Sequence, residues 1–342
     1  MFMKKKRLTI FDAGIAFLLA FILAQFTSAI GISLTQCILQ ACGKNSEQIT
    51  AFFDTSLGYL LQAIFMNIAF ILVFIWYARR IDKHELINKP NSNTFNYVWK
   101  CIIIGIATLF LLSGVLNYFQ LLVDKLGFTA SELTYELNSP KNYIISLISL
   151  ALIPAICEEL LFRGVLVNAL KHKGQIFSII LSSIMFSIFH FSPTQLIYPI
   201  CFGLILSIIY LRTGNIIFSI LLHFINNALT ISIQYFSNSS GGQFVHSASM
   251  LIYTIVTLSI WIAIMVYLFK DLKSHNKLKI STLANTDNFD SSINNTKSQT
   301  TQNNDVSTIK DSETPENTKL NNLVFYGSIS IMLCIYILLL ML

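Results

Sequence analysis

Apolar residues fill long runs of this chain, and only short polar segments separate them. The runs predict membrane-spanning helices at about 8–34, 51–78, 97–123, 142–170, 175–191, 195–211, 214–235, 249–269 and 322–342. Each run is about long enough to cross ~30 Å of hydrocarbon, and 175–191 and 195–211 are the shortest. The pattern therefore predicts an all-α fold, a polytopic transmembrane helix bundle of about eight to nine spans.

The composition excludes an ordinary soluble domain. Of the 342 residues, 54% are hydrophobic and only 12% are charged, whereas charged residues normally make up about a quarter of a soluble chain. The formal net charge of +6 could indicate an anionic partner, but the membrane explains it better. We expect contact with membrane lipid and no nucleic-acid partner.

The distribution of Lys and Arg predicts how the chain is oriented. Three lysines and an arginine at 4–7 come directly before the first apolar run, as in a cytoplasmic anchor. If the N-terminus is cytoplasmic, the outside loops hold only Lys44, Lys125 and Lys141. This asymmetry supports a multi-pass protein of the cell membrane with its N-terminus in the cytoplasm.

The segment Pro154–Gly164 places three ionisable residues in an otherwise apolar stretch. Such groups are costly at membrane depth and are usually functional. Glu159 and Arg163 are four residues apart, so they share a helix face and can pair. Glu158 is rotated by about 100° and has no partner on its own helix. The alternative is a structural ion pair beside a carboxylate near the lipid headgroups.

Two other predicted spans carry polar residues that reach a similar depth. His190 ends the fifth span, and His223 and Asn227 lie four apart on one face of the seventh. Counted from the cytoplasmic boundary at ~1.5 Å per residue, these three residues and Glu158 fall in one layer. Alone, each histidine could bond a neighbouring carbonyl, and the His–Asn pair could simply join helices. Together the four predict a site buried in the membrane.

Hydrolytic chemistry suits this set of groups. A carboxylate and an imidazole around one water form a general base, and a second histidine with an asparagine amide can donate hydrogen bonds to an oxyanion. Glu159 and Arg163 would hold the helix and bias the local field. Cys157 projects from another face than Glu158, and we interpret it as a core residue.

The motifs E-E-x-x-x-R, F-x-x-x-H and H-x-x-x-N occur in this order, at Glu158–Arg163, Phe186–His190 and His223–Asn227. Over about 142–235 the chain resembles the CAAX-processing and bacteriocin-processing intramembrane proteases, also called the type II CAAX prenyl endopeptidase (CPBP) family. The resemblance implies an intramembrane endopeptidase that cleaves a peptide or protein substrate near its C-terminus.

The resemblance also implies residue roles. Glu158 with His190 would activate water, His223 and Asn227 would form the oxyanion hole, and Glu159 and Arg163 would support them. The family has long carried a metallopeptidase label, and Glu158, His190 and His223 could in principle ligate zinc. Since H-E-x-x-H is absent and the six cysteines lack metal-ligand spacing, we expect no cofactor, with a zinc-dependent protease as the alternative.

Two other classes of function compete with the protease. A non-catalytic membrane protein, for bacteriocin self-immunity or partner binding, would tolerate loss of the site residues. A transporter would normally show interrupted helices and an internal repeat, and no repeat is visible. The sequence predicts no particular oligomeric state.

The chain divides into five predicted segments. These are N-terminal transmembrane helices at 1–140, the protease core at 141–235, an additional transmembrane helix at 236–270, a flexible cytoplasmic linker at 271–321 and a C-terminal transmembrane helix at 322–342. The linker prediction rests on its content of Asn, Ser and Thr and on the absence of an apolar period.

Overall fold

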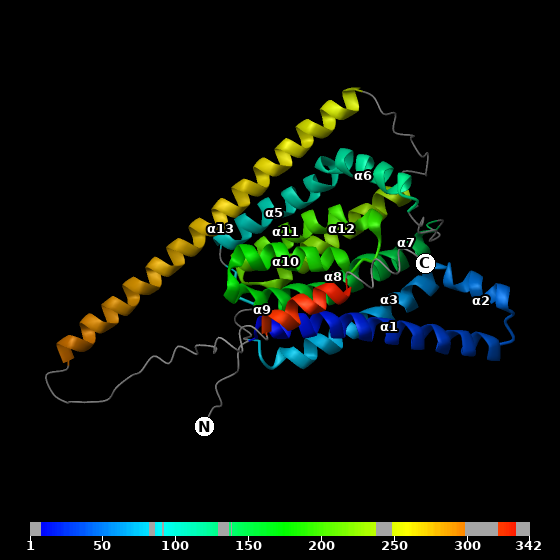
Figure 1. The fold of residues 1–342 in the computed structure, drawn as a ribbon, viewed down its shortest axis with the longest axis horizontal. Helices are drawn as coiled ribbons and strands as arrows, with labels where there is room; N and C mark the ends of the chain where they lie inside the picture. Colours follow the sequence, from blue (N-terminus) through cyan, green and yellow to red (C-terminus); the bar gives the residue numbers. More distant parts are fainter. Residues whose placement is uncertain are drawn as a thin grey trace.

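The protein is a helical bundle (Figure 1). The computed structural model describes residues 8–81, 86–90, 92–128, 137, 139–236, 248–297 and 321–332. Its helices are α1 (Ile10–Ala41), α2 (Ser46–Phe53), α3 (Ser56–Ala78), α5 (Ser92–Leu111), α6 (Ser113–Lys125), α7 (Pro140–Ser146), η1 (Leu147–Leu152), α8 (Ile153–Glu159), η2 (Leu160–Val167), α9 (Asn168–Leu170), η3 (Lys171–Lys173), α10 (Gln175–Ile188), η4 (Pro193–Gln195), α11 (Ile197–Thr213), α12 (Ile216–Phe236) and α13 (Ala248–Lys297). Residues 321–332 form a further helix.

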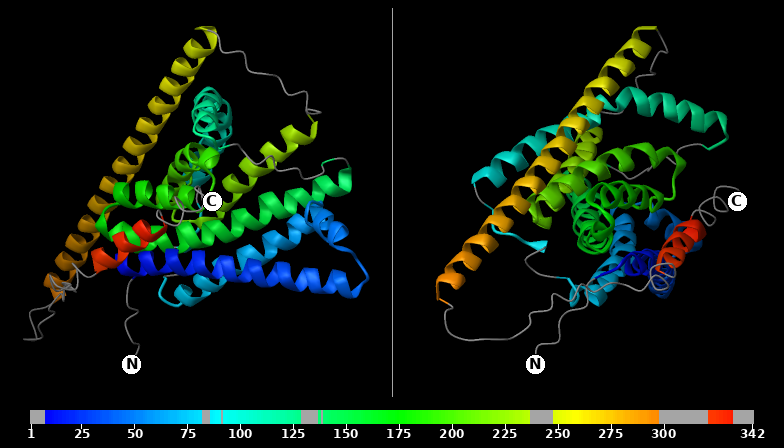
Figure 2. Two further views of the ribbon diagram at one scale, coloured as in Figure 1. Left: turned by 45° about the vertical axis from the view of Figure 1, so that its right-hand side comes forward. Right: turned by 60° about the vertical axis from the view of Figure 1, so that its left-hand side comes forward.

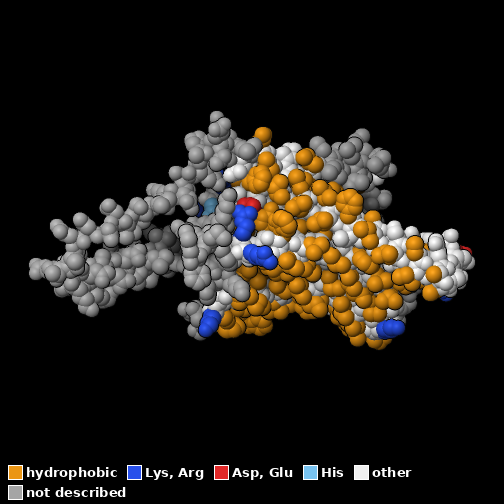
Figure 3. Space-filling view, turned by 90° about the horizontal axis from the view of Figure 1, so that it is seen from below, with side chains coloured by type: hydrophobic (Ala, Val, Ile, Leu, Met, Phe, Trp, Pro, Cys, Tyr) orange, Lys and Arg blue, Asp and Glu red, His pale blue; other side chains and the backbone are white. Residues whose placement is uncertain are grey.

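The helices have the length and composition of a membrane protein. Within the described residues, seven are long and apolar enough to cross a membrane, at Ile10–Ala41, Ser56–Ala78, Thr94–Leu111, Pro140–Lys173, Pro193–Thr213, Ile216–Phe236 and Met250–His275. The apolar helix α10 is shorter. Hydrophobic side chains cover most of the described surface in Figure 3. The predicted all-α transmembrane bundle is therefore confirmed, with a span count roughly as expected.

Two predicted spans prove to be broken. The run at 51–78 contains the end of α2 and a separate α3. The run at 97–123 splits at Leu112 into α5 and α6. Just after this break, Gly114 lets α6 lie close to α13, because a side chain there would collide with Thr254. The chain changes direction at the point where α6 packs against α13.

The helix that carries Glu158 is irregular. The run Pro140–Lys173 is continuous, but η1 and η2 are π-helical turns on either side of α8. Such turns are rare in proteins, and those that occur are often found at functional sites. Pro154 lies between them and lacks the N–H that an α-helix would use to bond the carbonyl of Leu150. A sequence pattern does not locate such turns.

The structure differs from the predicted linker over part of its length. α13 continues through 271–297, where we expected the flexible linker to begin. The helix Ala248–Lys297 contains no proline or glycine, so no residue in it breaks the backbone hydrogen bonding. Residues 298–320 lie outside the described part of the chain, and so does the segment 1–7, so the rest of that linker and the cytoplasmic anchor stay predictions.

The described part of the bundle has two large apolar cores on either side of the helix Pro140–Lys173, and a third, small cluster of Val167, Tyr210 and Ile216. The first core joins α1, α3, the buried face of α8–η2, the end of α10 and the helix 321–332. The second joins α5, α11, α12 and α13. The views in Figure 2 show α1 and α3 side by side, with 321–332 next to α1. The polar residues of the helix Pro140–Lys173 therefore lie between these two large cores.

Candidate active site

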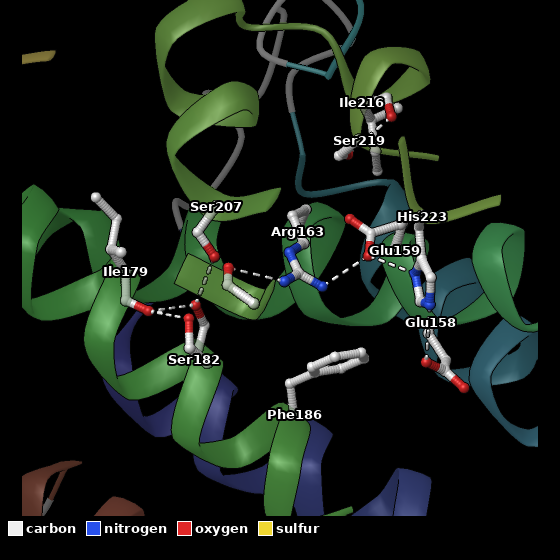
Figure 4. Close-up of polar contacts among 12 residues, drawn as sticks. Glu158, Glu159, Arg163, Ile179, Ser182, Phe186, Ser207, Ile216, Ser219 and His223 are labelled. Atoms are coloured by element: carbon white, nitrogen blue, oxygen red, sulfur yellow. Dashed lines mark hydrogen bonds and ion pairs between the residues drawn. The ribbon is translucent and has the colours of Figure 1, made fainter. Parts of the chain in front are cut away.

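Glu159 and Arg163 form a fully buried ion pair. Arg163 Nη1 donates to Glu159 Oε1 at 2.7 Å, and neither side chain is exposed. Arg163 Nη2 donates to the carbonyl oxygen of Gly203 in α11 at 3.1 Å. The guanidinium lies over the ring of Phe186, 5.0 Å from its centroid. The pair thus joins the helix Pro140–Lys173, which carries Glu158, to α10 and α11, as Figure 4 shows.

His223 on α12 joins this pair. Its Nδ1 lies 3.0 Å from the same Glu159 oxygen that accepts from Arg163. Because a carboxylate oxygen only accepts, Nδ1 carries the proton and Nε2 is directed elsewhere. Nε2 lies 3.9 Å from Glu158 Oε2, close but beyond hydrogen-bond distance. Glu159 therefore orients His223 toward Glu158 (Figure 4).

Glu158 and His190 line one cavity. The cavity has a volume of about 150 Å³ and is also lined by three phenylalanines and Met66 of α3. His190 Nδ1 lies 2.9 Å from the carbonyl oxygen of Phe186. A carbonyl only accepts, so Nδ1 carries the proton and Nε2 is left as an acceptor. A carboxylate and a basic imidazole nitrogen thus border the same space.

His190 lies just beyond the end of α10. The helix ends at Ile188, and His190 lies in the turn that follows. The next residue, Phe191, has φ +48°, which is uncommon for a residue other than glycine. Its ring packs against Phe21 at 4.8 Å and Phe189 at 6.0 Å. The aromatic contacts thus accompany a strained turn beside a candidate catalytic group.

Asn227 is hydrogen-bonded to two neighbours. Its Nδ2 donates to the carbonyl oxygen of Leu150 at 3.3 Å, the carbonyl that Pro154 leaves without an α-helical donor. Its Oδ1 accepts from Asn226 Nδ2 at 3.3 Å. The structure therefore places Asn227 against the helix that carries Glu158, and no hydrogen bond joins it to His223 among the described residues.

Several residues of the site were not singled out by the sequence. Tyr198 of α11 donates its hydroxyl to Asn226 Oδ1, which continues the chain of amides to Asn227. Gly203 contributes only a backbone carbonyl. No motif marks these residues, although Asn226 directly precedes Asn227 in the sequence. Phe186 packs between the two histidines: its ring lies 5.0 Å from the His190 ring and 5.7 Å from that of His223.

The described side chains do not form a metal-ligand set. No group of three or more His, Cys, Asp or Glu lies close enough to hold an ion within the part of the chain that the structure describes. A zinc site built from Glu158, His190 and His223 would need free ring nitrogens and carboxylate oxygens in one sphere. Nδ1 of each histidine is bonded, to Phe186 and to Glu159, so only Nε2 of each ring would remain as a metal ligand.

A comparison with known families agrees with this geometry. Residues 140–229 match the family model described as Type II CAAX prenyl endopeptidase Rce1-like. The matched segment includes all three motifs, from Glu158 to Asn227, and the family is one of proteases. The resemblance inferred from the motifs is therefore confirmed. No curated protein and no solved structure matches the chain.

Proposed function

We propose that the protein is an intramembrane endopeptidase that hydrolyses a peptide bond near the C-terminus of its substrate. The observation that carries the proposal is the cavity shared by Glu158 and His190 within the segment that matches the protease family. Ionisable groups facing a cavity inside a membrane bundle favour a catalytic role over a structural one.

The first step is attack by water. A water in the cavity donates one hydrogen bond to Glu158 and one to His190 Nε2, and its oxygen adds to the carbonyl carbon of the scissile bond. Glu158 takes the proton as this C–O bond forms. When the tetrahedral intermediate collapses, the C–N bond breaks and the leaving amine takes that proton from Glu158. The products are a carboxyl and an amine terminus.

The oxyanion is stabilised from α12. His223 lies beside Glu158 and is held there by Glu159 through its Nδ1–H. In this role His223 acts as the imidazolium, with a second proton on Nε2 that it donates to the oxygen that develops charge. Asn227 provides the second donor when its amide turns from the carbonyl of Leu150 to the substrate. Hydrogen bonds in a site without substrate are often longer than those made during catalysis.

In this proposal the water is activated without a metal. The support is that no group of three His, Cys, Asp or Glu side chains lies close enough to hold an ion among the residues that the structure describes. The Arg163 guanidinium supplies a fixed positive charge behind the reacting groups, because Glu159 bonds both Arg163 and His223.

The test is cleavage of quenched peptides by the full chain purified in detergent. The panel holds plain and lipidated peptides, and each is tried with and without a chelator. Glu158→Gln is expected to lower kcat by about 10²–10⁴-fold while the helical content stays that of the wild type. Glu47→Gln is the matched control, because Glu47 is exposed on α2, and it should cleave like the wild type.

Three results would separate the candidates. Cleavage that needs Glu158 and is indifferent to the chelator supports the proposal. Cleavage that the chelator abolishes and zinc restores contradicts the metal-free mechanism. Equal cleavage by the wild type and Glu158→Gln contradicts the role of Glu158 altogether.

A further inference from the structure

The cavity beside Glu158 is larger than the reacting water requires. A water occupies roughly 30 Å³ of liquid volume, against a cavity volume of about 150 Å³. Apolar cavities of about this size can take a benzene-sized group. After a water is placed against Glu158 and His190, most of the space is still bordered by Phe162, Phe189 and Met66.

Three of the walls are aromatic and fixed. Phe162, Phe186 and Phe189 are 1%, 2% and 5% exposed. The Phe162 ring lies edge to face against the rings of Phe186 and Phe189, at 5.1 Å and 6.0 Å. Phe189 also packs against Phe70 at 5.0 Å. Rings held on several sides cannot move without disturbing the core, so these walls define a cavity of set shape.

Met66 forms the rim and differs from the other walls. It is 36% exposed, the highest value among the lining side chains, and it lies near the middle of α3, whose ends are Ser56 and Ala78. An opening at that height faces hydrocarbon rather than water. Methionine has three rotatable bonds and adapts to irregular space. The rim is therefore the part of the wall that can adjust to a ligand entering from the membrane.

On the basis of the proposed function, we infer that this cavity binds one unmodified apolar side chain, of the size of leucine, methionine or phenylalanine, next to the scissile bond. Met66 sets the upper limit on the size of that side chain. A farnesyl group has many more carbon atoms than benzene, so most of it would have to lie outside this cavity, beyond Met66. The substrate class is thus a membrane peptide selected by a medium-sized apolar residue rather than by a prenylated cysteine.

The first test varies one residue beside the scissile bond in otherwise identical quenched peptides: alanine, leucine, phenylalanine, tryptophan or S-farnesylcysteine. The wild type should cleave the leucine and phenylalanine peptides with a kcat/KM at least about 10-fold above the alanine peptide, as expected for methylene-sized differences in an apolar pocket. Met66→Ala should raise the tryptophan-to-leucine ratio of kcat/KM about 10-fold. Ile64→Ala, a neighbouring exposed position on α3 outside the cavity lining, should leave the ratio unchanged.

The second test measures binding without turnover. The leucine peptide carries a photoactivatable diazirine in that side chain and is crosslinked to the Glu158→Gln protein. The labelled residue is assigned by fragmentation of the peptides, and the label is expected at or next to Met66 or Phe162. A label spread over lipid-facing positions such as Ile75 would overturn the inference.

The outcomes distinguish this inference from the function on which it rests. Cleavage that needs Glu158 but shows the same ratio in Met66→Ala and Ile64→Ala would overturn the pocket and keep the protease. Preference of the wild type for the farnesylated peptide would do the same. A crosslink at Met66 together with cleavage that does not need Glu158 would support the pocket and contradict the proposed mechanism.

Discussion

Replacing Arg163 with methionine tests the buried charge network behind the catalytic groups. Methionine keeps an unbranched apolar stem but removes the guanidinium, and with it the bonds to Glu159 at 2.7 Å and to the Gly203 carbonyl at 3.1 Å. Glu159 is then a fully buried carboxylate with His223 as its remaining described partner. Removing one member of a buried ion pair typically costs ~3–5 kcal/mol, so we expect a loss of about that size in the free energy of unfolding.

A double substitution separates the effect of losing the ion pair from the effect of leaving the buried charge of Glu159 without Arg163. Glu159→Gln with Arg163→Met removes both charges but keeps an amide oxygen that can accept from His223. Replacing both members of a buried pair is often nearly neutral. The double variant should therefore regain most of the stability that Arg163→Met loses, although cleavage should stay low because His223 is less firmly oriented.

Arg212→Met is the matched control. Arg212 Nε pairs with Asp271 at 3.0 Å and the guanidinium lies 4.8 Å from the Tyr97 ring centroid, but the paired side chains are 23% and 28% exposed. A partly exposed pair contributes ~0–1 kcal/mol. Both variants are measured by equilibrium unfolding of the full chain in mixed micelles, followed by circular dichroism. Equal losses for the two arginines would refute the reasoning.

Two further substitutions test the packing around the site. Tyr198→Phe removes the hydroxyl that holds Asn226 and should lower kcat about 10-fold with KM unchanged, in steady-state assays; a change in KM alone would contradict a positioning role. Gly114→Ala adds a methyl against Thr254, whose Cβ would lie 3.0 Å away, and should destabilise the fold by about 1–3 kcal/mol. Gly327→Ala is its control, because an added methyl there meets nothing within 4 Å, and its unfolding free energy should not fall.

The local parts of the site could be predicted from the sequence. The spacing of Glu159 and Arg163 predicts their contact, which the helix period fixes to within one turn, and the structure has it at 2.7 Å. The same period separates Glu158 from that pair, and its nearest described charge partner is His223 of another helix. Helix geometry is local, so a spacing of four residues carries this information.

The remaining contacts depend on packing between helices. Nothing in the spacing of His223 and Asn227 predicts that Glu159 accepts from the first and that the second donates to Leu150. Both bonds depend on how α12 is rotated against the helix that carries Glu158. The second also depends on the carbonyl of Leu150, which Pro154 leaves without an α-helical donor. The break at Leu112 and the shared cavity of Glu158 and His190 are likewise products of tertiary packing.

The central claim is that Glu158 and His190 act on one water. Single-turnover cleavage by Glu158→Gln, by His190→Gln and by the double variant tests it most directly. Residues that act as a unit are non-additive, so the account predicts that the double variant cleaves about as slowly as the slower single variant. Losses that multiply in the double variant, or a His190→Gln protein that cleaves at the wild-type rate, would contradict it.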